Sequence, residues 1–319
     1  TNQVSKKYVQ QVARVLEEAK PLRVFILPGN HDYFGPNSVY QSEEFTKPSQ
    51  HITIFRERKP FVVPDLDLTL YPSPCFETRS NESPAKGVSK QPGTKYHVAV
   101  LHGSIPSVIG RTSEEDDSFP MTVDELKNLG MDYIALGHWH SLYPDPVTSP
   151  DSPFYYSGTP EPTGFGERMS GHAILVELLE RGRQVSAIPT AQHSYVDVDI
   201  EVKTVQDIEA VRTNLAGLPK SEMTLVRLQP KGVVSIAVRE ALDTLVAEFQ
   251  SRVAYIRYED KGLMLEPDET DLNQFTKGGI ASTTFSLLKK ERDQASSSDR
   301  PKYERAIALA YKAFKGTLD

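Results

Sequence analysis

The first part of the chain changes from a helical to a strand-like apolar pattern. Apolar residues recur at helical spacing from Val4 to Ala19, and Pro21 ends this helix because proline cannot continue it. A short apolar run then spans residues 22–27. Its length and its β-forming residues predict a strand buried on both faces, as in a parallel or mixed sheet covered by helices.

Two further apolar runs of the same kind follow, at residues 97–101 and 132–136. A polar stretch at residues 77–95 predicts a surface loop before the first of them. Between the two runs, Thr122-Val123-Asp124-Glu125 has the spacing of a capping box, and Gly130 marks the end of the helix it begins. Strands that alternate with helices in this way predict the α/β class.

The pattern continues with strands near 171–178 and 184–189, and it changes character near residue 197. The elements expected after that point are a helix at 205–215, a strand at 223–228, a helix at 236–250, a strand at 253–258, and two helices from 271 that are separated by residues 294–299. We therefore predict three parts: residues 1–196, a small α/β domain at 197–268, and a helical segment at 269–319.

Composition limits the function classes. The 319 residues are 38% hydrophobic and 25% charged, which is typical of a globular protein, and no apolar run is long enough to cross a bilayer. Cys75 is the single cysteine, so no intrachain disulfide can form, and this fits a reducing compartment. No apolar signal core follows the first residues. These features predict a cytoplasmic protein without a membrane partner.

The formal net charge of −7 argues against tight DNA binding by this chain alone, because proteins that bind nucleic acid by charge are usually basic. It argues less strongly against a nuclease, since bound divalent ions add positive charge at the site. A partner subunit could supply the rest.

Each of the three predicted N-terminal strands ends in a turn that carries histidine. The turns are Gly29-Asn30-His31-Asp32, His102-Gly103 and Gly137-His138-Trp139-His140. Open α/β sheets build their sites at the carboxyl ends of strands, and dimetal phosphate-ester chemistry needs imidazole and oxygen donors from several strands. Gly137 is expected to permit the turn that brings both following histidines to the site. The candidate metal ligands are Asn30, His102, His138 and His140.

These motifs, in this order, resemble the later motifs of the calcineurin-like metallophosphoesterases. The segment Tyr156-Ser157-Gly158-Thr159-Pro160-Glu161, with Phe165-Gly166-Glu167 behind it, resembles the SbcD-type DNA exonucleases. The resemblance is specific over residues 22–178 and looser over 197–319. It implies a four-layer α/β metallophosphoesterase sandwich, incomplete at its N-terminus, followed by a small α/β capping domain and C-terminal helices that reach an ATPase partner.

The resemblance also implies a role for each site residue. Asn30, His102 and His138 would bind one divalent ion and His140 a second, most often Mn²⁺ in this family. His31 would face the scissile phosphate, stabilise developing charge and protonate the leaving oxygen. Asp32 would orient the His31 imidazole.

The function implied is metal-dependent cleavage of DNA, in double-strand-break repair or end processing, together with an SbcC-type ATPase. A homodimer is also compatible with the family.

The sequence differs from the family pattern in one feature. Family members open with Asp-x-His and Gly-Asp strand ends, and neither motif occurs in this sequence. Two alternatives therefore stay open: a phosphodiesterase for small esters, and a non-catalytic scaffold that binds DNA or a partner.

Overall fold

The computed structural model describes residues 2–47, 51–109, 118–265 and 279–315, and they form two compact units. Unit 1 comprises residues 1–163 and 167–191, and unit 2 comprises residues 164–166 and 192–319. The predicted α/β class is confirmed. The boundary predicted at 196/197 falls inside strand β10 (Ser194–Glu201), and the one predicted at 268/269 lies outside the described residues.

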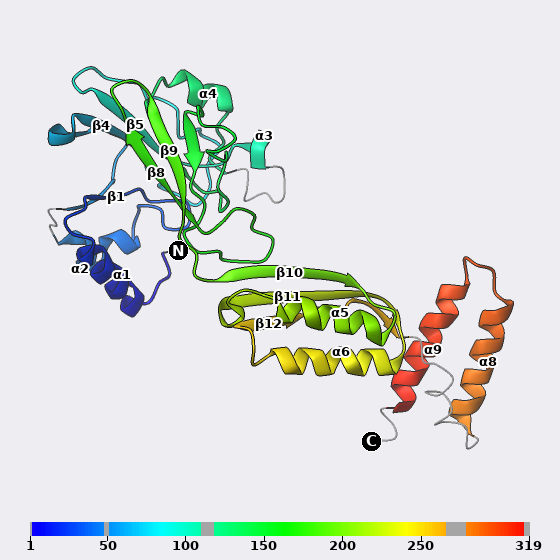
Figure 1. The fold of residues 1–319 in the computed structure, drawn as a ribbon. Coiled ribbons are helices and arrows are strands. Elements are labelled where there is room, and N and C mark those ends of the chain that lie inside the picture. The colour runs from blue at the N-terminus through cyan, green and yellow to red at the C-terminus, as the bar shows by residue number, and fades with distance from the viewer. Residues whose placement is uncertain (1, 48–50, 110–117, 266–278, 316–319) are drawn as a thin grey trace. The chain divides into compact units, whose positions relative to one another are not determined.

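A five-stranded sheet forms the centre of unit 1 (Figure 1). Its strands, in spatial order, are β3 (Phe61–Val63), β4 (Leu68–Ser73), β5 (Tyr96–His102), β6 (Tyr133–Gly137) and β7 (Phe154–Tyr156). All neighbours run parallel except β3 and β4. The strands predicted at 97–101 and 132–136 are therefore confirmed as β5 and β6, and their carboxyl ends lie at the same edge of the sheet.

One face of this sheet packs against helix α4 (Val123–Asn128). Leu101 of β5 and Ile134 of β6 share a buried cluster with Leu126 of the helix. The predicted capping box begins α4: Glu125 N donates to Thr122 Oγ1 over 3.1 Å, and Thr122 N donates to Glu125 Oε2 over 2.8 Å. A capped helix on a dry core holds the ends of β5 and β6 in fixed positions.

Two smaller sheets complete unit 1. β1 (Val24–Ile26) pairs in parallel with β2 (Ile52–Ile54). The strands predicted near 171–178 and 184–189 are confirmed as β8 (His172–Leu178) and β9 (Arg183–Pro189), which pair in antiparallel orientation. The expectation that the first strand is buried on both faces was wrong, because β1 is only half-buried and pairs with β2 alone among the described residues. The predicted first helix is confirmed as α1 (Lys6–Glu18), whose apolar residues Tyr8, Val12 and Val15 are exposed while Val9 is buried.

Short helical segments occupy the connections of the chain. In unit 1 they are η1 (Val39–Gln41), α2 (Glu43–Thr46), η2 (Pro64–Leu66) and α3 (Pro106–Ile109), and in unit 2 η3 (Ser221–Met223). Within the described residues, the stretch at 77–95 contains no helix or strand, as predicted. Cys75 is buried, and burial raises its pKa to about 12, so it packs as a small apolar side chain.

Unit 2 contains a parallel sheet with two helices on one face (Figure 1). β10 pairs with β11 (Thr224–Val234), whose other edge pairs first with β12 (Tyr255–Tyr258) and then with β13 (Gly262–Leu265). The helices are α5 (Val205–Ala216) and α6 (Ile236–Phe249), as the apolar periodicity predicted. Their buried residues, such as Ile208 and Leu242, share one core with Val226 of the sheet.

The C-terminal helices α8 (Ile280–Gln294) and α9 (Arg300–Lys315) lie side by side in unit 2 (Figure 1). Phe285, Ile307 and Tyr311 form a buried cluster with Ile236 at the start of α6. The two helices are therefore anchored to the small domain before them. Among the helices described, none combines the length and apolarity needed to span a bilayer.

Candidate metal centre

The ends of β1, β5 and β6 bring polar side chains together in unit 1. His102, the last residue of β5, pairs with Gly137 at the end of β6, so His138 follows directly beside it. The loop after β1 reaches the same place, because Asn30 Oδ1 lies 2.9 Å from His102 Nε2. The structure thus brings Asn30, His102 and His138 together from residues that are far apart in the sequence.

His102 lies at the centre of this group. The ring centroids of His102 and His138 are 5.3 Å apart, with the rings nearly perpendicular at 76°. Burial, together with the neighbouring His138, His31 and His140, lowers the pKa of His102 to about 3. His102 is therefore neutral at physiological pH, and the neutral imidazole is the form that binds a metal ion.

Two glycines allow the backbone to approach the His102 ring closely. A Cβ added to Gly29 would lie 2.6 Å from His102 Cε1, and one added to Gly137 would lie 2.9 Å from His102 Nδ1. Both distances are shorter than van der Waals contact. Gly137 is thus needed for close packing, while the positive φ in this turn belongs to His138, at 109°. This differs from the sequence expectation, which gave the unusual backbone conformation to Gly137; non-glycine residues in this region concentrate at functional sites.

His31 and Asp32 follow Asn30 in the loop after β1. The His31 side chain is exposed, whereas Asn30 beside it is buried. Asp32 accepts hydrogen bonds from Gly29 N over 3.0 Å and from the Tyr40 hydroxyl. Its carboxylate thus holds the loop that carries Asn30 and His31, and its role toward the His31 imidazole stays a prediction.

His140 is held by residues that the sequence placed only inside a family motif. Its Nδ1 lies 3.0 Å from Glu167 Oε1 and 3.4 Å from Thr163 Oγ1. Thr163 in turn donates to Glu167 twice, from Oγ1 to Oε1 over 2.5 Å and from N to Oε2 over 2.9 Å. Burial pushes the pKa of Glu167 upward, but the hydrogen bonds from Thr163 and His140 outweigh it, and the net shift is downward. The Glu167 carboxylate is therefore charged at neutral pH.

Sequence reasoning missed the residues that support the candidate ligands. Tyr40 contacts Asp32, and Glu167 contacts His140. The Tyr156 hydroxyl donates to Gly103 O over 2.6 Å, although the two residues are 53 positions apart in the sequence. Tyr156 and Glu167 lie at the two ends of the segment that suggested an SbcD-type protein, so that segment was the available signal. Nothing in the local pattern marked Tyr40.

Gly158 shapes the backbone beside His140. It has φ +71°, and a Cβ there would lie 2.7 Å from His140 O and 2.9 Å from Leu142 N. We expect Gly158→Ala to lower the free energy of unfolding by about 1–2 kcal/mol for the left-handed conformation and by about 1–3 kcal/mol more for overpacking. Chemical denaturation followed by circular dichroism measures this loss.

Gly87 provides the matched control for this substitution. It has φ +77°, but a Cβ there would meet nothing within 4 Å. Gly87→Ala should therefore show the conformational cost without the overpacking cost. If both variants lost the same free energy of unfolding, the close approach of Gly158 to the His140 carbonyl would add nothing to the cost of the substitution.

The residues at this centre fit a divalent metal ion. Two ligands about 2.1 Å from one ion, at right angles, lie about 3.0 Å apart, and the 2.9 Å between Asn30 Oδ1 and His102 Nε2 matches that separation. Within the described part of the chain, no group of three or more His, Cys, Asp and Glu side chains could hold a metal ion. A metal site here would therefore have to use the amide oxygen of Asn30 beside His102 and His138.

Imidazole and amide donors at adjoining strand ends of an α/β sheet are groups that a metal-dependent hydrolase could use. Residues 2–142 match the family model of the calcineurin-like phosphoesterases. These residues are therefore similar to a calcineurin-like phosphoesterase domain, and enzymes of that family hydrolyse phosphoesters with divalent metal ions. None of the curated proteins compared with the chain matches it.

Proposed function

We propose that this chain is a DNA nuclease subunit, a metal-dependent phosphodiesterase that processes DNA ends in double-strand-break repair together with an SbcC-type ATPase. The observation that carries the proposal is the contact of Glu167 with His140. Residues 156–167 are the part of the sequence that resembles SbcD-type exonucleases, and this contact ties them to a candidate ligand. The family domain alone supports only phosphoester hydrolysis.

Each residue of the centre has a place in that reaction. Asn30, His102 and His138 would hold one divalent ion, proposed as Mn²⁺, and His140 would hold the second. When bound, the ions lower the pKa of the attacking water and neutralise the phosphate charge. The exposed His31 imidazole would donate a proton to the leaving oxygen, while Asp32 keeps its loop in place through Gly29 and Tyr40.

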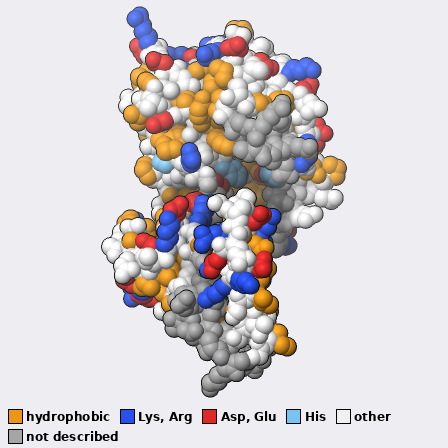
Figure 2. Space-filling model, turned by 90° about the vertical axis from the view of Figure 1, so that its right-hand side faces the viewer, with side chains coloured by type: hydrophobic (Ala, Val, Ile, Leu, Met, Phe, Trp, Pro, Cys, Tyr) orange, Lys and Arg blue, Asp and Glu red, His pale blue; other side chains and the backbone are white. Residues whose placement is uncertain are grey.

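Charge argues that DNA is bound with the help of a partner. The formal net charge is −7, and Figure 2 shows Lys and Arg side chains interspersed with Asp and Glu on the face in view. Sequence-independent DNA binding depends on a concentration of positive charge. A partner ATPase that contributes this charge is consistent with both observations.

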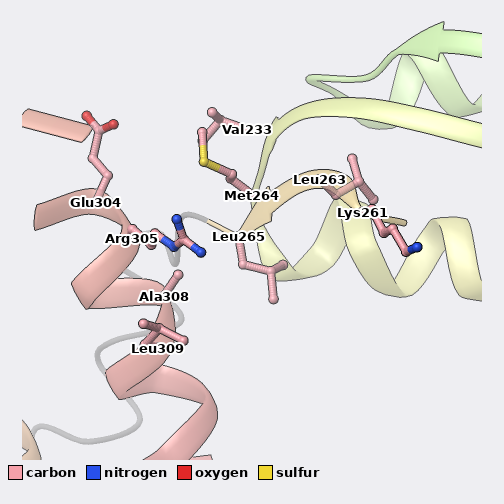
Figure 3. Close-up of a pocket in the computed structure, with 9 residues that line it drawn as sticks. All are labelled: Val233, Lys261, Leu263, Met264, Leu265, Glu304, Arg305, Ala308 and Leu309. Atoms are coloured by element: carbon pink, nitrogen blue, oxygen red, sulfur yellow. The ribbon is translucent and has the colours of Figure 1, made fainter. Parts of the chain in front are cut away.

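The C-terminal helices support the proposal of a partner. Ile280, Leu287 and Leu309 are exposed apolar residues of α8 and α9. A pocket of about 350 Å³ lies between α9 and the end of the unit 2 sheet, where Leu265, Ala308 and Leu309 line it beside Arg305 (Figure 3). Exposed apolar surface of this kind is typical of interaction sites, and it supports the proposal that the ATPase contacts α8 and α9.

Comparing two substrates tests the proposed function. We expect the protein with Mn²⁺, alone and with an SbcC-type ATPase, to shorten linear double-stranded DNA, and the ATPase to increase the rate. Bis(p-nitrophenyl) phosphate serves as the small phosphodiester in a parallel assay. Gel electrophoresis of the DNA and absorbance of released nitrophenolate measure the two activities.

The outcomes separate the proposal from its alternatives. Cleavage of the small ester without cleavage of DNA would contradict the nuclease and favour a small-molecule phosphodiesterase. DNA or ATPase binding without cleavage of either substrate would favour the scaffold. Cleavage of DNA that EDTA abolishes and Mn²⁺ restores would support the nuclease.

A further inference from the structure

Glu167 meets His140 through one nitrogen of the ring, and this contact determines which nitrogen stays available. Glu167 Oε1 lies 3.0 Å from His140 Nδ1. Both Glu167 oxygens already accept hydrogen bonds from Thr163, so the carboxylate group is an acceptor toward His140 as well, and Nδ1 carries the proton. The proton of the neutral ring is then used at Nδ1, and Nε2 keeps its lone pair for a metal ion.

The exposure of the two side chains agrees with this orientation. The His140 side chain is 56% exposed, whereas that of Glu167 is 16% exposed. The Glu167 side chain is thus largely shielded from solvent, whereas the His140 ring is open to solvent, where an ion and a substrate phosphate can reach it. Thr163 fixes the carboxylate itself, because its hydroxyl and its amide each donate to a different Glu167 oxygen.

The backbone of the same turn is held by the same stretch of chain. Thr159 donates to His140 O from its amide over 3.0 Å, and Leu142 N donates to Met169 O over 2.9 Å. Residues 159–169 therefore fix both the backbone and the ring of His140. This double fixation is what metal ligands commonly receive from the residues behind them.

We propose that Glu167 is a positioning residue that holds His140 in the Nδ1–H tautomer, so that Nε2 binds the second divalent metal ion. Thr163 completes this support by orienting the Glu167 carboxylate. The inference rests on the proposed metal-dependent function, because it takes His140 as a ligand. It adds to that function two residues, Glu167 and Thr163, that act through His140 and do not touch the substrate.

Nitrogen-15 NMR of the His140 ring in the metal-free protein tests the first half of the inference, with the signal assigned by its absence in His140→Ala. We expect the Nδ1–H tautomer in the unaltered protein. Glu167→Ala should shift the population toward the Nε2–H tautomer that free imidazole side chains favour in water. Thr163→Ser keeps the hydroxyl and should leave the tautomer unchanged, whereas Thr163→Val should move it toward that of Glu167→Ala.

Titration with Mn²⁺ alone tests the second half. We expect Glu167→Gln to weaken binding of one ion by about 10–100-fold, the usual effect of losing the carboxylate behind a histidine ligand. Glu177→Gln is the matched control: Glu177 is an exposed residue of β8, and the same charge is removed there without any described contact with His140. Its Mn²⁺ affinity should equal that of the unaltered protein, and thermal unfolding of each variant checks that it is folded.

The two measurements distinguish failure of the inference from failure of the proposed function. A His140 tautomer that stays unchanged in Glu167→Ala would overturn the inference, and the function would still stand if His140→Ala lost affinity for Mn²⁺. Unaltered Mn²⁺ affinity in His140→Ala would instead remove the ligand assignment on which both depend. A changed tautomer together with weakened Mn²⁺ binding would support both.

Discussion

His31→Ala is expected to lower phosphodiester cleavage by about 10²–10⁴-fold, the contribution of a single general acid. His31 is exposed and follows the buried Asn30, so its ring can reach a substrate phosphate without binding the ion held by its neighbour. Affinity for Mn²⁺ should therefore stay unchanged. Initial rates of cleavage of linear double-stranded DNA, whose leaving oxygen needs a proton, and a Mn²⁺ titration of the same preparation measure the two effects.

Two further variants separate proton donation from simple hydrogen bonding. His31→Gln keeps a hydrogen-bond donor but has no acidic proton to give, so its rate should fall nearly as far as that of His31→Ala. His193→Ala, a histidine outside the three strand-end motifs, should leave the rate unchanged. Equal loss of cleavage and of Mn²⁺ binding in His31→Ala would show that His31 is a ligand and not the acid.

The strands that carry the candidate site could be predicted because each is a short apolar run followed by a polar turn. β5 and β6 were predicted correctly for this reason. Their carboxyl ends lie together because the two strands pair in parallel. β4 was missed although it lies between β3 and β5, because Pro72 falls inside it and proline is rare in central strands. β11 runs six residues beyond its predicted end for a similar reason, since it contains Pro230 and Gly232.

The supporting residues of the site could not be predicted in the same way. Glu167 and His140 are 27 residues apart in the sequence, and Tyr156 and Gly103 are 53 residues apart. Contacts at such sequence separations follow no helical or strand periodicity, so sequence patterns do not reveal them. The positive φ of His138 was not predicted either, because the unusual backbone conformation was expected at Gly137, the glycine before it. Local patterns thus indicate which side chains could bind a metal ion, while the contacts that orient them depend on how distant loops pack.

His102→Ala is expected to weaken binding of one Mn²⁺ ion by more than 100-fold, beyond the roughly 10–100-fold that losing a residue behind a ligand costs. His102 links the three strand ends: its Nε2 faces Asn30, and its ring packs against His138 and between Gly29 and Gly137. Removing the ring takes away one donor and leaves a gap where Asn30 and His138 lose their common neighbour. Isothermal titration with Mn²⁺ measures the change.

His97 in the same strand gives the control that separates this effect from damage to β5. It is buried, whereas His102 is half-buried, its Nδ1 lies 2.9 Å from the Tyr71 hydroxyl, and it is five residues before the strand end. Because the buried hydroxyl would lose a partner, His97→Ala should cost about 1–3 kcal/mol of stability and leave Mn²⁺ affinity unchanged. If His102→Ala bound Mn²⁺ as the unaltered protein does, Asn30, His102 and His138 would not be ligands of one ion, and their proximity would reflect packing of the strand ends alone.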